Sequence, residues 1–307
     1  MDNGVVICRP QGGLNDMLCQ IERCCAYAER HDRTVIVDTN HRSTAFFKDS
    51  FARYFVSRQA MLSFDTDVLA RLAEEADVLP ACLGGRVNSY DGFWHGGLKT
   101  YVDGHSDRVL SFDFNQAHPQ KILVHHAMGG GEASLAALGR MRLHEDLVEM
   151  LLERLRAIGG EFAGVHVRNT DYKTNYEPYV DRIARAVDGP LLVASDDRQV
   201  IDCFKAAMGE GRVFSFSRLP DQTTQPLHHI FGDTDAFTRN CDAILDLVML
   251  ALARRFYGFM LEPNPNGAAY SGFMLLVNQL RCARPVLADV IARPGAPLDE
   301  MFAAPLG

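Results

Sequence analysis

The residues best suited to chemistry stand together where a short apolar run ends, near the middle of the chain. His166, Arg168 and Asp171 close or follow the segment 162–167, which is small, β-branched and apolar. That composition is typical of an inner strand of a parallel sheet, and ligands bind at the carboxyl ends of such strands. An Arg there can grip a phosphate through two parallel, charge-assisted hydrogen bonds. Taken alone, however, the pattern favours a simple ion pair between Arg168 and Asp171.

Two adjacent acids follow a second apolar run. Asp196 and Asp197 come after the predicted strand 191–194 and lead into a predicted helix. Capping of that helix explains one of them. Two carboxylates at this edge could instead accept hydrogen bonds from a ribose or a base, or hold Mg²⁺. Capping alone and ligand contact are both compatible with the sequence.

Two further polar residues are set in apolar or glycine-rich surroundings. Asp246 falls inside the apolar run 243–252, where an unpaired carboxylate is costly. It must face either a core Arg or the N–H groups of a ligand, such as a guanine edge. Ser271 begins a helix predicted over 271–280, whose first amides could bind an anion. A plain N-cap is the simpler interpretation of Ser271.

A glycine turn near the start of the chain could also receive a ligand. Gly12 and Gly13 lie between a predicted strand and a predicted helix, with Asn15 directly after them. Free backbone N–H groups in such a turn can bind phosphate or a sugar hydroxyl. No Gly-Lys-Ser/Thr follows and the third glycine of the dinucleotide fingerprint is missing, so a plain tight turn is equally compatible.

The elements that must position these residues alternate between strand and helix. A strand at 5–8, a helix to about residue 31 and a strand at 34–38 form a βαβ unit, and strands and helices alternate again from 162 to 280. The sequence therefore predicts an α/β protein with two Rossmann-like domains, over residues 1–145 and 146–307. The segment from about 40 to 120 shows no clear pattern.

Composition limits the possible functions. The chain has 307 residues, of which 47% are hydrophobic and 23% charged, as in ordinary globular proteins. A net charge of -8 argues against binding to long nucleic acids, which require a basic surface. No apolar stretch approaches the roughly 20 residues that span a bilayer, and no secretory signal is evident at the start. We therefore expect a cytoplasmic protein.

The eight cysteines form no Cys-x-x-Cys pair and stand mostly in apolar segments. Buried, reduced thiols are the simplest interpretation, and we expect no metal site.

In chain order, four motifs resemble the fucosyltransferase superfamily: Gly12-Gly13-Leu14-Asn15, then 164–171, then 194–197, then the helix that carries Asp246. The resemblance is nearest to the α1,6-fucosyltransferases, including the rhizobial nodulation enzymes. It implies a GT-B fold, in which two Rossmann-like domains face each other across a cleft. It also implies inverting, metal-independent transfer of fucose from GDP-fucose to a saccharide hydroxyl. The first domain would face the acceptor and the second would bind the GDP-sugar.

The resemblance also assigns roles to residues of the second domain. Arg168 would hold the β-phosphate and stabilise the departing GDP, while His166 and Asp246 would contact guanine. Asp196 or Asp197 would support the nucleotide pocket.

Closer to the chemistry, Asp171 would shape the catalytic centre, and Asn15 would approach the donor or acceptor from the first domain. The α1,6 enzymes place a Glu shortly after this Asp. Tyr176 occupies the matching position here, and Glu177 lies one residue later. Glu177 is therefore the candidate base, with Lys173 as a possible phosphate or acceptor contact.

The sequence departs from the family after the last predicted strand. The family has a Ser-rich segment soon after that strand, whereas this chain has residues 263–267 there and its Ser only at position 271. Ser271 is therefore the candidate phosphate ligand of this region.

Two other functions and one further contact are also compatible with the sequence. The chain could use another GDP-sugar, or bind nucleotide or carbohydrate without catalysis. Tyr90, Phe93 and Trp94 could stack on a sugar, although core packing is their simpler use.

Overall fold

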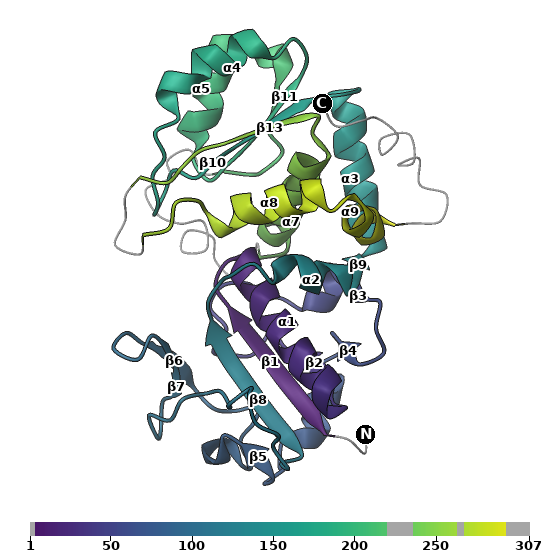
Figure 1. Cartoon of the computed structure of the whole chain (residues 1–307), viewed down its shortest axis with the longest axis vertical. Helices are drawn as coiled ribbons and strands as arrows, with labels where there is room; N and C mark the ends of the chain where they lie inside the picture. Colours follow the sequence, from purple (N-terminus) through teal and green to yellow (C-terminus); the bar gives the residue numbers. More distant parts are fainter. Residues whose placement is uncertain (1–3, 220–235, 263–266, 293–307) are drawn as a thin grey trace. The chain divides into compact units, whose positions relative to one another are not determined.

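The structure is a computed structural model that describes residues 4–219, 236–262 and 267–292. The chain forms two compact units, Met1–His144 and Glu145–Gly307, and each is described by itself (Figure 1).

The first unit is built on a parallel sheet of five strands in the order β4-β2-β1-β8-β5. The register pairs the central strands over their full length, for example Val5 with Ile122 and Gln11 with Met128. The strands are β1 (Val5–Gln11), β2 (Thr34–Val37), β4 (Leu62–Ser63), β5 (Val78–Leu79) and β8 (Ile122–Met128). The predicted βαβ unit is present, with the helix α1 (Leu14–His31) between β1 and β2.

The two faces of this first sheet are covered differently. Helix α1 packs against one face, where the thiols of Cys8 and Cys24 meet. Val5 and Ile7 point to the other face, into a cluster made by short turns and irregular segments. The remaining elements of the unit are short: η1 (Phe51–Arg53), β3 (Phe55–Ser57), η2 (Asp67–Leu72), η3 (Ala81–Leu83), β6 (Gly92–His95), β7 (Thr100–Asp103), α2 (Ser134–Gly139) and β9 (Met141–Leu143).

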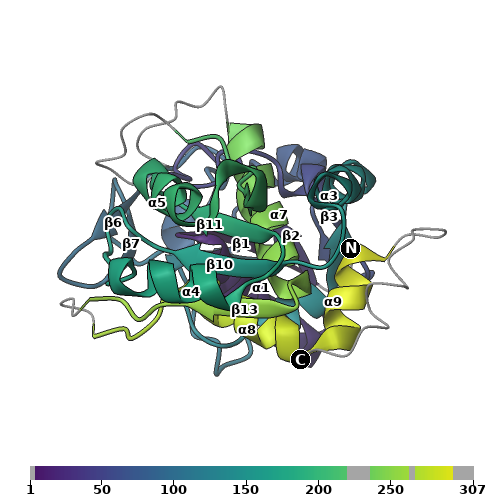
Figure 2. The ribbon, with the colours of Figure 1, turned by 90° about the horizontal axis from the view of Figure 1, so that it is seen from above.

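The second unit has a parallel sheet of four strands in the order β12-β11-β10-β13. Strands β11, β10 and β13 lie side by side in Figure 2. The elements follow in sequence as α3 (Glu145–Ile158), β10 (Ala163–Val167), η4 (Glu177–Tyr179), α4 (Val180–Ala186), β11 (Leu191–Ser195), α5 (Arg198–Met208), η5 (Glu210–Arg212), β12 (Val213–Phe214), α7 (Ala236–Leu252), β13 (Arg255–Gly258), α8 (Gly272–Cys282) and α9 (Arg284–Ile291).

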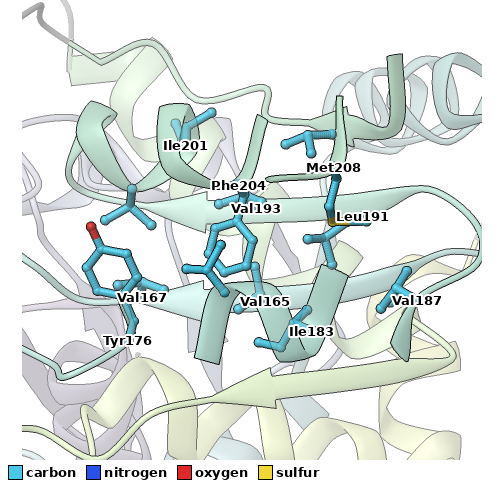
Figure 3. Packing of buried hydrophobic residues seen from close by; sticks show 14 residues of the cluster. Val165, Val167, Tyr176, Ile183, Val187, Leu191, Val193, Ile201, Phe204 and Met208 are labelled. Atoms are coloured by element: carbon cyan, nitrogen blue, oxygen red, sulfur yellow. The ribbon is translucent and has the colours of Figure 1, made fainter. Parts of the chain in front are cut away.

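Alternate residues of β10 serve the two faces of this second sheet. Val165 points toward Val193 and Phe204, in the cluster that α4 and α5 close (Figure 3). Gly164 faces the other way, toward α7. A Cβ at Gly164 would come within 2.8 Å of the Leu250 side chain, so glycine lets α7 lie directly on the strand. His166 lies on the same face as Gly164, because strand residues two apart share a face.

The predicted α/β class is confirmed, and both sheets are parallel. Helix α3 begins at Glu145 and no earlier, because Leu143 pairs with Phe55 in the antiparallel β3–β9 ladder. All eight cysteines are free, and five of them are buried. Within the described ranges, no helix is both long enough and apolar enough to span a membrane. The predicted second domain includes residues 220–235 and 293–307, which lie outside the described residues.

Candidate active site

Arg168 follows the last residue of β10, and its guanidinium is held by two carboxylates. One terminal nitrogen lies 2.5 Å from Asp171 Oδ1 and the other 3.0 Å from Asp196 Oδ2. The side chain is 29% exposed. The simple ion pair with Asp171 is therefore observed, yet a guanidinium has five N–H donors, and these two contacts leave others for an anion.

Asp196 and Asp197 hold the loop that carries Arg168. Both are buried at the carboxyl end of β11, the neighbour of β10. Asp196 accepts hydrogen bonds from Asn169 N (2.7 Å) and Thr170 Oγ1 (2.5 Å). Asp197 accepts from Nδ2 of the Asn169 side chain at 2.8 Å and caps α5 by accepting from Gln199 N at 3.0 Å. Capping thus explains Asp197, whereas Asp196 fixes the Arg168 loop.

His166 lies beside the start of α8. Its ring stacks on that of Phe273, with centroids 4.8 Å apart. Desolvation and, secondly, the charge of Arg168 lower the pKa of His166 to about 3, so the imidazole is neutral at physiological pH. Ser271 is the N-cap of α8 and accepts a hydrogen bond from Met274 N at 3.2 Å. The first amides of α8 are thereby placed near the carboxyl end of β10.

Asp246 has the core Arg that its burial requires, but it shares that Arg with a second acid. Arg154 of α3 pairs with Asp242 and lies 3.5 Å from Asp246 Oδ1. Ser217 Oγ donates to Asp246 Oδ2 at 2.6 Å. Asp242 also accepts from Arg218 N at 3.1 Å. Two buried carboxylates therefore face one guanidinium, and desolvation raises the pKa of Asp246 to about 7.

The segment that follows Arg168 carries the candidate base and returns along the sheet edge. Lys173 Nζ donates to Asn169 O at 2.6 Å, and its backbone carbonyl accepts from Glu262 N at 2.7 Å. Tyr176 is buried in the core cluster, at 4% exposure. Glu177 opens η4 and is exposed. Of Tyr176 and Glu177, only Glu177 therefore faces solvent, where it could meet an acceptor.

The glycine turn of the first unit is shaped by its own neighbours. Gly12 has φ +98°, and a Cβ there would lie 2.8 Å from Asp16 Oδ2. Gly13 has φ -70° and open space around its missing Cβ. Asn15 is buried and accepts from Ser134 Oγ at 2.7 Å. Gly12 and Asn15 thus have structural roles within the unit, and Gly13 offers an accessible backbone.

In the described part of the chain, no group of three or more His, Cys, Asp or Glu residues is arranged to hold a metal ion. Four residues of this region, Arg154, Asp242, Ser217 and Phe273, are not part of the predicted site. Of these four, only Asp242 could have been identified from the sequence, because it lies four residues before Asp246 and therefore on the same face of the helix.

Comparison with solved structures identifies proteins with a similar backbone fold. NodZ α1,6-fucosyltransferase, co-crystallised with GDP, matches over 91% of this chain and 93% of its own, with a TM-score of 0.58 and 17% identity. The enzyme from Bradyrhizobium gives the same TM-score. POFUT1 in complex with GDP matches over 96% of this chain and 98% of its own, with a TM-score of 0.56 and 13% identity. The chain has the fold of the fucosyltransferases.

The predicted resemblance is therefore confirmed at the level of fold. No protein-family model matches the chain, and no curated protein matches it. The similarity to the fucosyltransferases thus lies in the backbone, while few side chains are shared.

Proposed function

We propose that the chain is a glycosyltransferase that moves fucose from GDP-fucose to a hydroxyl of a saccharide acceptor, with inversion and without a metal ion. The observation that carries the proposal is the half-exposed Arg168 guanidinium at the carboxyl end of β10. It stands on a fold shared with fucosyltransferase structures, one of which was soaked with GDP-fucose. A cytoplasmic location is part of the proposal.

Arg168 suits the leaving group of this reaction. In an inverting transfer the sugar becomes oxocarbenium-like while negative charge grows on the departing diphosphate. A fixed guanidinium therefore stabilises the transition state more than the ground state. Asp171 and Asp196 hold the guanidinium in place before the donor arrives, so little reorganisation is needed.

The acid pair on α7 suits a guanine. Asp242 and Asp246 share the single positive charge of Arg154, so one buried carboxylate lacks full compensation. Guanine presents adjacent N1–H and N2–H donors to such a group, whereas adenine and uracil do not offer this pair of donors. The neutral His166 and the ring of Phe273 add a flat apolar surface on the same face of the sheet.

Thermal unfolding with added nucleotides tests the proposal directly. GDP should raise the melting temperature more than ADP or UDP, because all three carry the diphosphate and only GDP carries guanine. Asp246→Asn should remove that preference and leave the ADP effect unchanged. Equal stabilisation by the three nucleotides would refute the guanine assignment.

The affinity for GDP should depend on pH. Only the ionised Asp246 can accept both guanine donors, and its pKa is raised to about 7, chiefly by desolvation. Arg154, Asp242 and Ser217 are the groups that face it. One unit below the pKa about a tenth of the carboxyl is ionised, so GDP should bind about tenfold more weakly at pH ~6 than at pH ~8. Calorimetry of wild type and Asp246→Asn measures this, and ADP serves as the control for titration of the phosphate.

Glu177 is the proposed base, and its substitution should separate binding from catalysis. Glu177→Gln should keep GDP binding but lower transfer about 10²-fold to 10⁴-fold, because the acceptor hydroxyl keeps its proton. The exposed Glu177 has few structural constraints, so its loss should leave the melting temperature unchanged. Initial rates with GDP-fucose and an acceptor array provide the measurement.

The matched comparison is Asp171→Asn. If this change alone abolishes transfer while Glu177→Gln is active, Asp171 is the base. If wild type binds GDP but turns over no acceptor, the protein is a binding module of the same fold. Slow hydrolysis of a panel of GDP-sugars identifies the sugar, and preference for one other than fucose would correct the donor.

A further inference from the structure

The β6–β7 hairpin of the first unit carries the only Trp of the chain, and this Trp is exposed. Trp94 is 40% exposed and its neighbour Phe93 is 44% exposed, whereas Tyr90 is fully buried. The hairpin projects from the β1–β8 sheet in Figure 1. Trp94 and Phe93 are consecutive in β6, so their side chains point to opposite faces of the hairpin.

The Trp94 side chain packs against a buried residue of the neighbouring strand. Trp94 lies opposite Tyr101 in the ladder, and their rings meet edge to face at 5.6 Å. Tyr101 is buried and stacks on His126 of β8 at 4.7 Å. At Gly92 a Cβ would lie 3.1 Å from the His126 ring, so glycine lets the root of the hairpin close onto β8. The indole is thereby held in place before any ligand arrives.

The same face carries polar groups with spare hydrogen-bonding capacity. Asp103 lies opposite Gly92 in the ladder, so it shares the face of Trp94 and Tyr101. Its Oδ2 accepts from Arg86 at 2.6 Å, and the Arg86 side chain is 31% exposed. Asp103 Oδ1 and His126 Nε2 are buried and have no hydrogen-bond partner within the described residues. Both atoms lie beneath the surface, so Arg86, rather than Asp103 or His126, is the polar side chain that a ligand can reach.

We propose that this face, defined by the exposed Trp94 and the partly exposed Arg86, binds the saccharide acceptor. A pyranose ring has an apolar face of C–H groups that can stack on the indole, and hydroxyls at its rim that can reach Arg86, which the buried Asp103 holds from behind. The inference rests on the proposed transfer to a saccharide, and it adds the place at which the acceptor is recognised.

The exposed area favours a sugar over a second copy of the chain. At 40% exposure the indole offers apolar area on the order of 100 Å². A stable protein interface needs about 800 Å² on each partner, much more than this face supplies. One or two sugar rings match the exposed indole in size.

The experiment uses Trp94 as its own reporter, since the chain has one Trp and its emission comes from this residue alone. The wild-type protein is titrated with cellotriose, chitotriose and maltotriose. At least one of them should shift the emission to shorter wavelength and saturate. Trp94→Ala should weaken binding of that saccharide about tenfold, as measured by calorimetry. Trp94→Phe should restore part of the affinity.

Phe93→Ala is the matched control, because Phe93 has similar exposure but points to the opposite face of the ribbon. It should bind the saccharide within about twofold of wild type. An unchanged emission with all three saccharides overturns the inference, and so does equal loss in the two Ala variants. A shift that follows protein concentration instead of saccharide would mean self-association and overturns it too.

The GDP titration on the same sample separates this inference from the proposed function. GDP stabilisation without a saccharide response removes the hairpin site and leaves the donor assignment standing. A saccharide response without GDP stabilisation removes the donor assignment and leaves the hairpin site standing.

Discussion

Arg168→Ala is expected to lower the rate of fucose transfer about 10²-fold to 10³-fold, as loss of one preorganised donor does where charge develops in a transition state. The fold should survive, because Asp196 keeps its hydrogen bonds from Asn169 and Thr170. Arg168→Lys should fall between Ala and wild type, since it keeps the charge but loses the planar fork. GDP release from GDP-fucose in the presence of acceptor gives the rates.

Arg254→Ala is the control for charge in the same unit. Arg254 also pairs with an acid, Glu161, at 2.6 Å, but that pair is 58% and 60% exposed. Exposed pairs contribute little to stability, so this variant should retain wild-type rates and melting temperature. If Arg168→Ala turns over as fast as Arg254→Ala, Arg168 does not bind the diphosphate.

Arg154→Met is expected to have the largest effect on stability, about 3 kcal/mol in the free energy of unfolding. It leaves Asp242 and Asp246 buried one helical turn apart without a cation. The pKa of Asp246, already raised by desolvation, should then rise further in the folded state. The unfolded chain releases that proton at lower pH, so the loss of stability should grow as pH rises from about 4 to about 8. Urea unfolding at several pH values measures it.

Arg156→Met is the matched control, because Arg156 is two residues further along α3 and is exposed. Its effect should stay within about 0.5 kcal/mol. Asp242→Asn in the Arg154→Met background should recover part of the loss by removing one of the two charges. Equal stability of the two Met variants would mean that the acids do not depend on Arg154.

The second unit was largely predictable because its strands are continuous apolar runs. Runs of this kind fix a parallel sheet, and the carboxyl ends of adjacent strands then meet. The proximity of Arg168 to Asp196 follows from that geometry, since β10 and β11 are neighbours. The simplest structural interpretations were also observed: Asp171 forms an ion pair with Arg168, and Asp197 and Ser271 cap helices. Their ligand roles remain predictions.

Other parts of the structure could not be predicted, because their contacts join distant segments. Arg154 meets Asp242 across 88 residues of sequence, and no local pattern announces the pair. The segment from about 40 to 120 is made of short strands and single turns that cover the Ile7 face of the first sheet. Strands of two to four residues have too few positions to show a period. The exposure of Trp94 could not be predicted either, because its strand, β6, has only four residues.

Gly164 sets a spacing within the second unit. Because this residue of β10 has no side chain, Leu250 of α7 and Ala253, which directly follows α7, come to rest on the strand itself. Arg168 is four residues further along the chain, just beyond the end of β10, and Asp246 is one helical turn before Leu250. The separation between the Arg168 guanidinium and the acid pair of Asp242 and Asp246 is therefore fixed by the packing of one strand against one helix. Under the proposed function, a side chain at position 164 would change that separation and with it the fit of the nucleotide.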